Sequence, residues 1–199
     1  MLNVYLLRHG ETSMNADGNR YCGRTDVALT EKGIEQAHLV KNQLIETQLD
    51  AVYSSPLVRA FHTAEIACGG VEVIKDKRLI EVDFGGWEGK TREEFIEDNP
   101  LSWDRWSSDP THVKAGETGE TALEVVQRVN SFFEEKREMH PNGTIMVVGH
   151  NGLNRLFLSW KLGMELKNYR RIVQENSSVT FFSLDENNEI LLKLLNCRR

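Results

Sequence analysis

Two histidines of the chain each stand at the end of an apolar run. His9 follows residues 4–7 in the opening stretch LLRHGETSMN, and His150 follows residues 145–148 in TIMVVGH. Both runs are typical of buried strands, and the glycine beside each histidine marks the point where the strand ends. Because ligands bind at the carboxyl ends of strands in open α/β sheets, two parallel strands would bring His9 and His150 to one reactive edge.

Two arginines accompany these histidines and indicate a reaction. Arg8 precedes His9, and Arg59 comes shortly after Ser55 and Pro56, a pair that predicts a helix with Pro56 at its first position. A neutral imidazole can attack phosphorus in line, while guanidinium groups bind the equatorial oxygens in bidentate fashion. The helix N-terminus would further favour an anion beside Arg59. The pattern therefore predicts phosphoryl transfer to nitrogen.

Such a reaction also needs neutral donors for the phosphate and a proton for the leaving alkoxide. Asn15 and the amides around Gly10 are candidates for the donors. Glu81 is the candidate acid, because it ends the strand-like segment 71–82, where a carboxyl group can be partly buried beside a phosphate. Asp83 would lie on the same side of an extended chain and is the alternate proton donor. The sequence leaves this choice open.

The remaining pattern alternates strands with helices. Helical spacing or capping signals predict helices within residues 26–50, 56–68, 121–140 and 153–162, and apolar runs predict strands at 51–55, 71–82 and 144–148. Residues 177–185 and 189–197 predict a closing hairpin. We expect one three-layer αβα domain over residues 1–199, with a mainly parallel central sheet, an antiparallel edge strand and a helical lid insertion at about 83–120. Trp87, Trp103 and Trp106 of this insertion either line a substrate pocket or pack the lid.

Composition restricts the partners and the compartment. The formal charge of -6 argues against a non-specific nucleic-acid binder, although a few inward-facing arginines can still make a local positive pocket. Cys22, Cys68 and Cys197 are odd in number and lack CxxC spacing, which disfavours a disulfide framework. The chain shows no signal peptide and no apolar run that could span a bilayer. We expect a cytoplasmic protein with no membrane partner.

The histidines are not spaced as metal ligands usually are. The sequence contains no HxH, HExxH or CxxC pattern, no dinucleotide cradle after a strand and no GxxxxGK[ST] loop. We therefore expect a site without metal or cofactor, whose partner is a small phosphorylated metabolite. A homodimer is left open.

Four stretches, in this order, carry a resemblance to a known family: LLRHGETSMN, YSSPLVRAFHTAE, RLIEVDFGGWEG and VVGHNG. Together they closely resemble the histidine phosphatase superfamily, in its phosphoglycerate mutase-like branch, and the resemblance spans nearly the whole chain. It is the combination that is specific, since any one of these motifs alone is weak.

The resemblance implies a role for each site residue. His9 would be the nucleophile that forms a phosphohistidine, Glu81 the proton donor, and His150 the group that stabilises the transferring phosphoryl. Phosphate would be bound by Arg8, Asn15 and Arg59. Cys22 and Gly23 match the family's substrate-contacting pair, and we add Gly10 and Asn151, which adjoin the two histidines, to the phosphate-binding candidates.

Mutases of this superfamily differ from the chain in two respects. They are longer between the proton donor and the second histidine, and they carry an arginine directly after the glutamate, where this chain has Val82. Residues 82–120 hold four basic against ten acidic residues, which makes this lid a poor second anion site. We expect a metal-independent phosphatase that hydrolyses small phosphomonoesters. The alternatives are mutase-type phosphoryl transfer and a non-catalytic phosphometabolite-binding protein.

Overall fold

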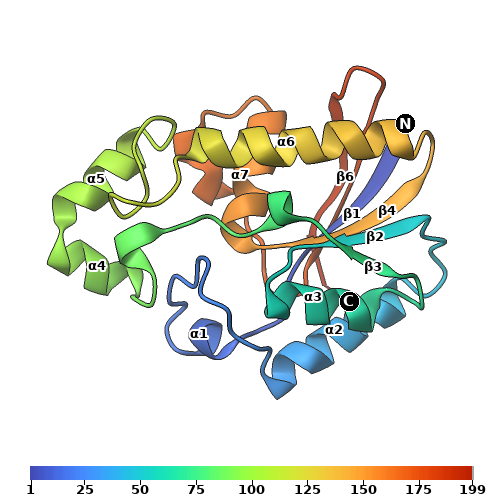
Figure 1. The fold of residues 1–199 in the computed structure, drawn as a ribbon, viewed down its shortest axis with the longest axis horizontal. Helices are drawn as coiled ribbons and strands as arrows, with labels where there is room; N and C mark the ends of the chain where they lie inside the picture. The colour runs from blue at the N-terminus through green and yellow to red at the C-terminus, as the bar shows by residue number, and fades with distance from the viewer. Residues whose placement is uncertain (199) are drawn as a thin grey trace.

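A mixed six-stranded sheet forms the centre of the molecule (Figure 1). The computed structural model describes residues 1–198. The strands follow the order β3-β2-β4-β1-β5-β6, and the pairs β3–β2, β2–β4 and β4–β1 are parallel, whereas β1–β5 and β5–β6 are antiparallel. Their bounds are Leu2–Arg8 (β1), Ala51–Ser54 (β2), Val73–Lys75 (β3), Thr144–Gly149 (β4), Val179–Leu184 (β5) and Ile190–Cys197 (β6).

Helices cover both faces of the sheet. Helices α2 (Glu31–Gln43) and α3 (Val58–Ala67) pack on one face, and α6 (Ala122–Met139) and α7 (Asn151–Lys161) pack on the other (Figure 1). Successive side chains of a strand point to opposite faces. Accordingly Leu6 packs with the α6 and α7 side, and the next residue, Leu7, packs with the α2 and α3 side. The predicted three-layer architecture is confirmed.

The pairing of β1 with β4 fixes the relative height of the two strand ends. Leu7 lies beside Val148 and Arg8 beside Gly149, and the His9 amide donates to the Gly149 carbonyl at 3.1 Å. The two strands therefore end at the same level, and their next residues leave the sheet side by side.

Residues 83–120 extend from the body of the molecule at the end where these strands stop. They contain the 3-10 turn η2 (Gly85–Trp87) and the short helices α4 (Arg92–Asp98) and α5 (Pro100–Ser108), which lie apart from the sheet at the left of Figure 1. Trp87 is stacked on Phe95 with ring centroids 4.6 Å apart and contacts both Trp103 and Trp106. The structure therefore favours the packing role of these tryptophans. Three further short elements are α1 (Ser13–Ala16), η1 (Lys77–Leu79) and η3 (Leu166–Arg171).

The segment before Glu81 is not the long strand that was expected. Strand β3 ends at Lys75, because the Asp76 side chain accepts the Arg78 amide hydrogen bond at 2.9 Å and caps the 3-10 turn η1. The prediction that Glu81 ends a strand is therefore wrong, and Glu81 instead lies in extended backbone after this turn.

Helix α3 begins two residues later than predicted. The Ser55 amide still donates to the Val148 carbonyl at 3.0 Å, so the chain stays with the sheet through this residue. The helix then starts at Val58 with Leu57 as its N-cap, and Pro56 precedes it. Arg59 nevertheless lies on the first turn, as expected.

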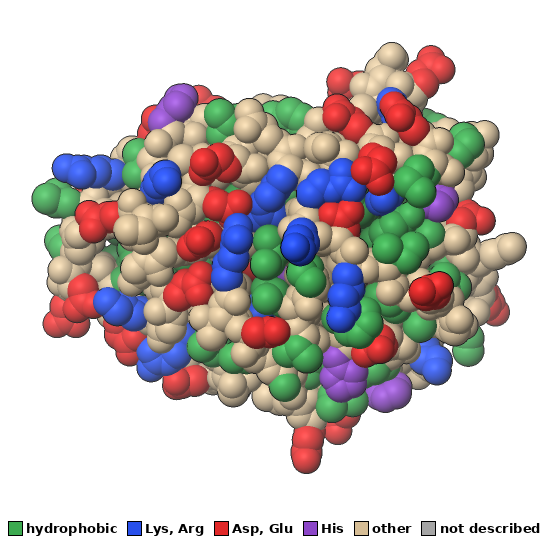
Figure 2. Space-filling view, in the orientation of Figure 1, with side chains coloured by type: hydrophobic (Ala, Val, Ile, Leu, Met, Phe, Trp, Pro, Cys, Tyr) green, Lys and Arg blue, Asp and Glu red, His purple; other side chains and the backbone are tan. Residues whose placement is uncertain are grey.

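Charged side chains of both signs occur on the face of the molecule that Figure 2 shows. Figure 2 shows Lys and Arg side chains interspersed with Asp and Glu over the face seen in Figure 1. Within residues 1–198, no helix is long and apolar enough to cross a membrane.

The loop after β1 rests directly on the start of α2. A Cβ atom at Gly33 would lie 2.2 Å from the Glu11 carbonyl oxygen, and one at Gly10 would lie 2.4 Å from the Gly33 oxygen. Both neighbours are backbone atoms, so neither can move aside without shifting the loop after His9.

We expect Gly33→Ala to lower the free energy of unfolding by about 1–3 kcal/mol, the usual cost of overpacking. Helix propensity alone would give the opposite sign, a gain of about 1 kcal/mol. Denaturant unfolding measures the difference. Asn42→Ala, at an exposed position of the same helix, is the control and should be neutral or slightly stabilising. A stabilised Gly33→Ala variant would contradict the close contact.

Candidate active site

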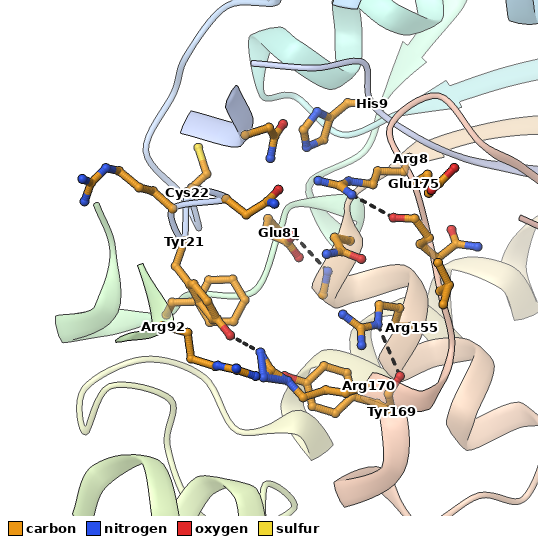
Figure 3. Close-up of a pocket in the computed structure, with 18 of the residues that line it drawn as sticks. Arg8, His9, Tyr21, Cys22, Glu81, Arg92, Arg155, Tyr169, Arg170 and Glu175 are labelled. Carbon is orange, nitrogen blue, oxygen red and sulfur yellow. Dashed lines mark hydrogen bonds between the residues drawn. The ribbon is translucent and has the colours of Figure 1, made fainter. Parts of the chain in front are cut away.

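A cavity of about 520 Å³ lies beyond the ends of β1 and β4 (Figure 3). Six arginines and three glutamates line it, so the cavity is positive although the chain as a whole is acidic. Its walls come from the end of β1, Asn15 and residues 18–22, the first turn of α3, residues of the segment 81–93, the first two turns of α7, and residues 169–170 and 172–175.

His9 is buried at the inner end of this cavity, with its ring oriented by the backbone. Its Nδ1 lies 2.7 Å from the Gly10 carbonyl oxygen, which can only accept, so Nδ1 carries the proton and the lone pair of the neutral ring is on Nε2. Burial, and then the charges of Arg59 and Arg8, hold the pKa of His9 well below its usual value of 6.5. His9 therefore presents an unprotonated nitrogen.

His150 lies beside His9 as the parallel strands require. The two ring centroids are 5.2 Å apart, and His150 is fully buried. Burial, followed by the charges of Arg59 and of His9, also lowers its pKa well below 6.5. Neither ring nitrogen has a hydrogen-bond partner among the described residues.

Arg8 is held by residues that come more than 160 positions later in the chain. It donates to the Gln174 carbonyl oxygen at 2.8 Å, and the Gln174 side chain is in turn bonded to Asn154 and Thr180. Burial lowers the pKa of Arg8 to about 10, which still leaves the side chain charged at neutral pH. A carbonyl acceptor orients the guanidinium without neutralising it.

Arg59 is held in the same manner. Its two terminal nitrogens donate to the carbonyl oxygens of Gly23 and Thr25, each at 2.8 Å, and the side chain is fully buried. The Thr63 hydroxyl donates to the Arg59 carbonyl and accepts the Gly10 amide at 3.0 Å, which links helix α3 to the loop after His9.

The structure distinguishes the two candidate proton donors by position. Glu81 lines the cavity and accepts backbone hydrogen bonds from Gly152 and Leu153, at 3.1 and 2.9 Å, at the start of α7. Asp83 does not line the cavity and accepts the Gly85 amide instead. Geometry therefore favours Glu81.

Of the other predicted residues, Asn15, Cys22 and Asn151 line the cavity. The Oδ1 of Asn15 accepts from the Thr12 amide and from Asn176, both at 3.1 Å, which leaves the amide NH₂ as the group that can donate to a ligand.

Gly10 and Gly23 are not among the residues that line the cavity. The Gly10 amide is bonded to Thr63, and its place is explained by the close approach to Gly33. Gly23 has a φ of 51°, and a Cβ atom there would lie 1.9 Å from the Glu88 carboxylate. Both glycines thus have a backbone reason to be glycine.

Sequence reasoning missed the far end of the cavity, which is lined by Arg155, Arg170, Tyr21 and Tyr169. Arg155 lies one helical turn after Asn151 and could have been inferred from that spacing. Arg170 carries no such signal, because η3 reaches the cavity only through tertiary packing. The expectation of a poor second anion site rested on an incomplete premise, since these arginines come from α7 and η3 rather than from residues 82–120.

Within residues 1–198, no group of three or more His, Cys, Asp or Glu side chains is arranged to hold a metal ion. The positive charge of the cavity is instead supplied by arginines.

The fold and the cavity define a class of protein: an α/β protein whose parallel strand ends bring two buried histidines together among buried arginines. The chain belongs to the histidine phosphatase superfamily (branch 1), whose family model matches residues 4–197.

Named relatives agree with this assignment. The chain is 38% identical over 196 residues to phosphoserine phosphatase 1 of Hydrogenobacter thermophilus, covering 98% of this chain and 92% of the relative. It is 32% identical over 167 residues to adenosylcobalamin/alpha-ribazole phosphatase of Escherichia coli, covering 82% and 80%. The crystal structure of a phosphoserine phosphatase from Entamoeba histolytica in complex with 3-phosphoglyceric acid is similar with a TM-score of 0.90 and 30% identity, covering 100% of this chain and 98% of that one.

The lowered pKa values of the two histidines lead to a pH prediction. In the free protein, NMR of ring-labelled histidine should show His9 and His150 in the neutral form at pH 6.5, with protonation only at lower pH. Arg8→Gln should raise the midpoint of His9, because the positive charge of Arg8 opposes protonation of the ring. His9→Asn assigns the resonance. Half-protonation of His9 at or above pH 6.5 in the unmodified protein would contradict this view of the site.

Proposed function

We propose that this protein hydrolyses small phosphomonoesters through a phosphohistidine formed on His9. The observation that carries the proposal is the neutral His9 ring, whose Nε2 is unprotonated while Arg8 and Arg59 lie beside it with their charges oriented by backbone carbonyls. This arrangement presents a nucleophile and a positive surround for the transferring phosphoryl group.

The reaction proceeds in two steps. Nε2 of His9 attacks phosphorus while the ester P–O bond breaks, and the leaving alkoxide takes a proton from the Glu81 carboxyl group. Water then attacks the phosphohistidine, Glu81 takes a proton from that water, and the N–P bond breaks to release phosphate. Arg8, Arg59, Asn15 and His150 bind the phosphoryl oxygens in both steps. No metal is required, since guanidinium groups supply the charge stabilisation.

Hydrolysis, rather than mutase-type transfer, is supported by the phosphatase names of the two relatives described above and by Val82 in the position directly after Glu81. The relatives named for phosphoserine support a phosphorylated amino acid or a similar small acid as substrate. The cytoplasmic location and the homodimer stay predictions.

The phosphoenzyme is the first test of this proposal. Brief incubation with a ³²P-labelled monoester, followed by a denaturing quench, should give an acid-labile and base-stable label in the unmodified protein and none in His9→Ala. Labelling and turnover should persist in excess EDTA. Equal labelling of His9→Ala would place the nucleophile elsewhere, and loss of activity in EDTA that one cation restores would remove the metal-independent mechanism.

The role of Glu81 is tested by changing the leaving group. An alkoxide needs a proton when it leaves, whereas p-nitrophenolate departs unaided. We expect Glu81→Gln to lose about 10² to 10⁴ in kcat with an alkyl phosphate, the usual contribution of a positioned general acid, and much less with p-nitrophenyl phosphate.

Asp83→Asn is the matched control and should lose little with either substrate, because Asp83 does not line the cavity. An equal loss of both substrates in Glu81→Gln would assign that residue to positioning the start of α7. A leaving-group dependence found only in Asp83→Asn would transfer the acid role to Asp83.

A further inference from the structure

The end of the cavity away from His9 contains two arginines that form no ion pair with a carboxylate among residues 1–198. Arg155 comes from α7 and Arg170 from η3, and both line the cavity. Neither lies within 4.0 Å of an Asp or Glu oxygen among residues 1–198. Two arginines elsewhere on the wall differ in this respect. Arg20 pairs with Asp17 and Glu94, and Arg92 lies near Glu93.

Aromatic side chains hold Arg170 in place without cancelling its charge. Its guanidinium carbon lies 4.5 Å from the Trp103 ring centroid and 5.9 Å from that of Tyr21, and it donates to the Tyr21 hydroxyl. Burial raises the pKa of Tyr21 to about 12, so this hydroxyl is neutral at physiological pH. The Nε of Arg170 is buried and has no hydrogen-bond partner in the part of the chain that the structure describes. The residue is therefore fixed and still positive.

Arg155 is held in a similar way by Tyr169. Its guanidinium carbon lies 5.2 Å from the Tyr169 ring centroid, and its Nε donates to the Tyr169 carbonyl at 3.3 Å. Its terminal nitrogens make no hydrogen bond to the described residues. Burial, with a smaller contribution from the Arg170 charge, lowers the pKa of Arg155. Holding two such charges near each other costs free energy that a bound anion would recover.

The position of the pair defines the part of a ligand that it could contact. In Figure 3, His9 and Arg8 lie on one side of the cavity, Arg155 and Arg170 lie on the other, and Glu81 lies between them. A ligand whose phosphoryl group is at His9, and whose leaving oxygen is near Glu81, would extend the rest of its structure toward Arg155 and Arg170.

We propose that Arg155 and Arg170 form a distal subsite that binds a second anionic group of the substrate, either a carboxylate or a second phosphate. This inference rests on the proposed function, because it assumes that the phosphoryl group is bound at His9. Each of these anions presents at least two oxygens, which a guanidinium group binds in bidentate fashion. The preferred substrates are then small phosphomonoesters with an acidic group at the opposite end.

Matched substrate pairs test the subsite. Phosphoserine against phosphoethanolamine removes only a carboxylate, and fructose 1,6-bisphosphate against fructose 6-phosphate removes only a phosphate. The pair in which the unmodified protein prefers the more anionic member identifies the group that is bound. p-Nitrophenyl phosphate, which has no second anion, reports the chemistry at His9 alone.

The variants are Arg155→Gln and Arg170→Gln, alone and combined, with Arg171→Gln as control. Arg171 is the exposed neighbour of Arg170 and does not line the cavity, so its loss removes the same charge from the same turn. Each subsite variant should lower kcat/KM for the preferred anionic substrate about 10- to 100-fold, mostly through KM, as expected for the loss of a charge-assisted contact. The kcat/KM of Arg171→Gln should change less than about threefold with every substrate. The kcat/KM of the subsite variants should change less than about threefold with the less anionic member of the pair and with p-nitrophenyl phosphate.

The outcomes separate the subsite from the proposed function. Two results would overturn the subsite and leave the proposed phosphatase function intact. In the first, the unmodified protein hydrolyses p-nitrophenyl phosphate but shows no preference within either substrate pair. In the second, the subsite variants lose kcat/KM equally for both members of a pair. If no monoester is hydrolysed, the proposed function fails, and calorimetric binding of the same pairs tests the subsite. Arginine-dependent preference in binding would support the subsite, and its absence would overturn it. Arg170→Lys, which keeps the charge, should restore part of the preference.

Discussion

The parallel pairing of β1 with β4 is the constraint on which the site depends. The two strands are about 140 residues apart in the sequence, but their pairing makes them end at the same level. Each strand therefore brings a histidine to the same edge of the sheet. The pairing also aligns the segments that leave the two strands. The loop after β1 packs against α2, and the chain after β4 turns directly into α7, whose first amides bind the carboxylate of Glu81. One register thus positions the proposed nucleophile His9, its partner histidine and the candidate acid.

Positive charge is kept available in this cavity by the choice of hydrogen-bond acceptors. Arg8 donates to one backbone carbonyl, Arg59 to two, and Arg155 to another, while Arg170 donates to a neutral tyrosine hydroxyl. Such acceptors orient a guanidinium without offsetting its charge, whereas a carboxylate would offset it. Burial, and then the charges of Arg59 and Arg8, hold the pKa of His9 well below its usual value and keep its ring neutral. A single arrangement therefore makes the cavity positive and keeps the candidate nucleophile neutral.

The parts that the sequence predicts well are those fixed by periodicity and by strand ends. Buried strands, the αβα layering, His9, His150, Arg8, Arg59 and Glu81 come from local patterns, and the structure brings these residues together. The failures have tertiary or capping causes. Asp76 caps a turn where a strand was expected, and Pro56 precedes its helix because Ser55 still bonds to β4. Arg170 reaches the cavity by packing that no spacing in its own segment signals.

Phe84, Arg92 and Glu93 are the residues of 82–120 that line the cavity, so the acidic character of the whole segment says little about specificity. Other residues of the segment act on the cavity through packing. Trp103 of α5 lies against Arg170, and Tyr21 lies edge-on to both Phe84 and Phe95 while it accepts from the same arginine. Arg170 is thus oriented by an aromatic cluster that joins the helical insertion to the cavity wall. Substitutions in that cluster can shift the distal guanidinium while β1 and β4 keep His9 in place. The proposed distal subsite and the proposed nucleophile His9 are therefore positioned by separate parts of the fold.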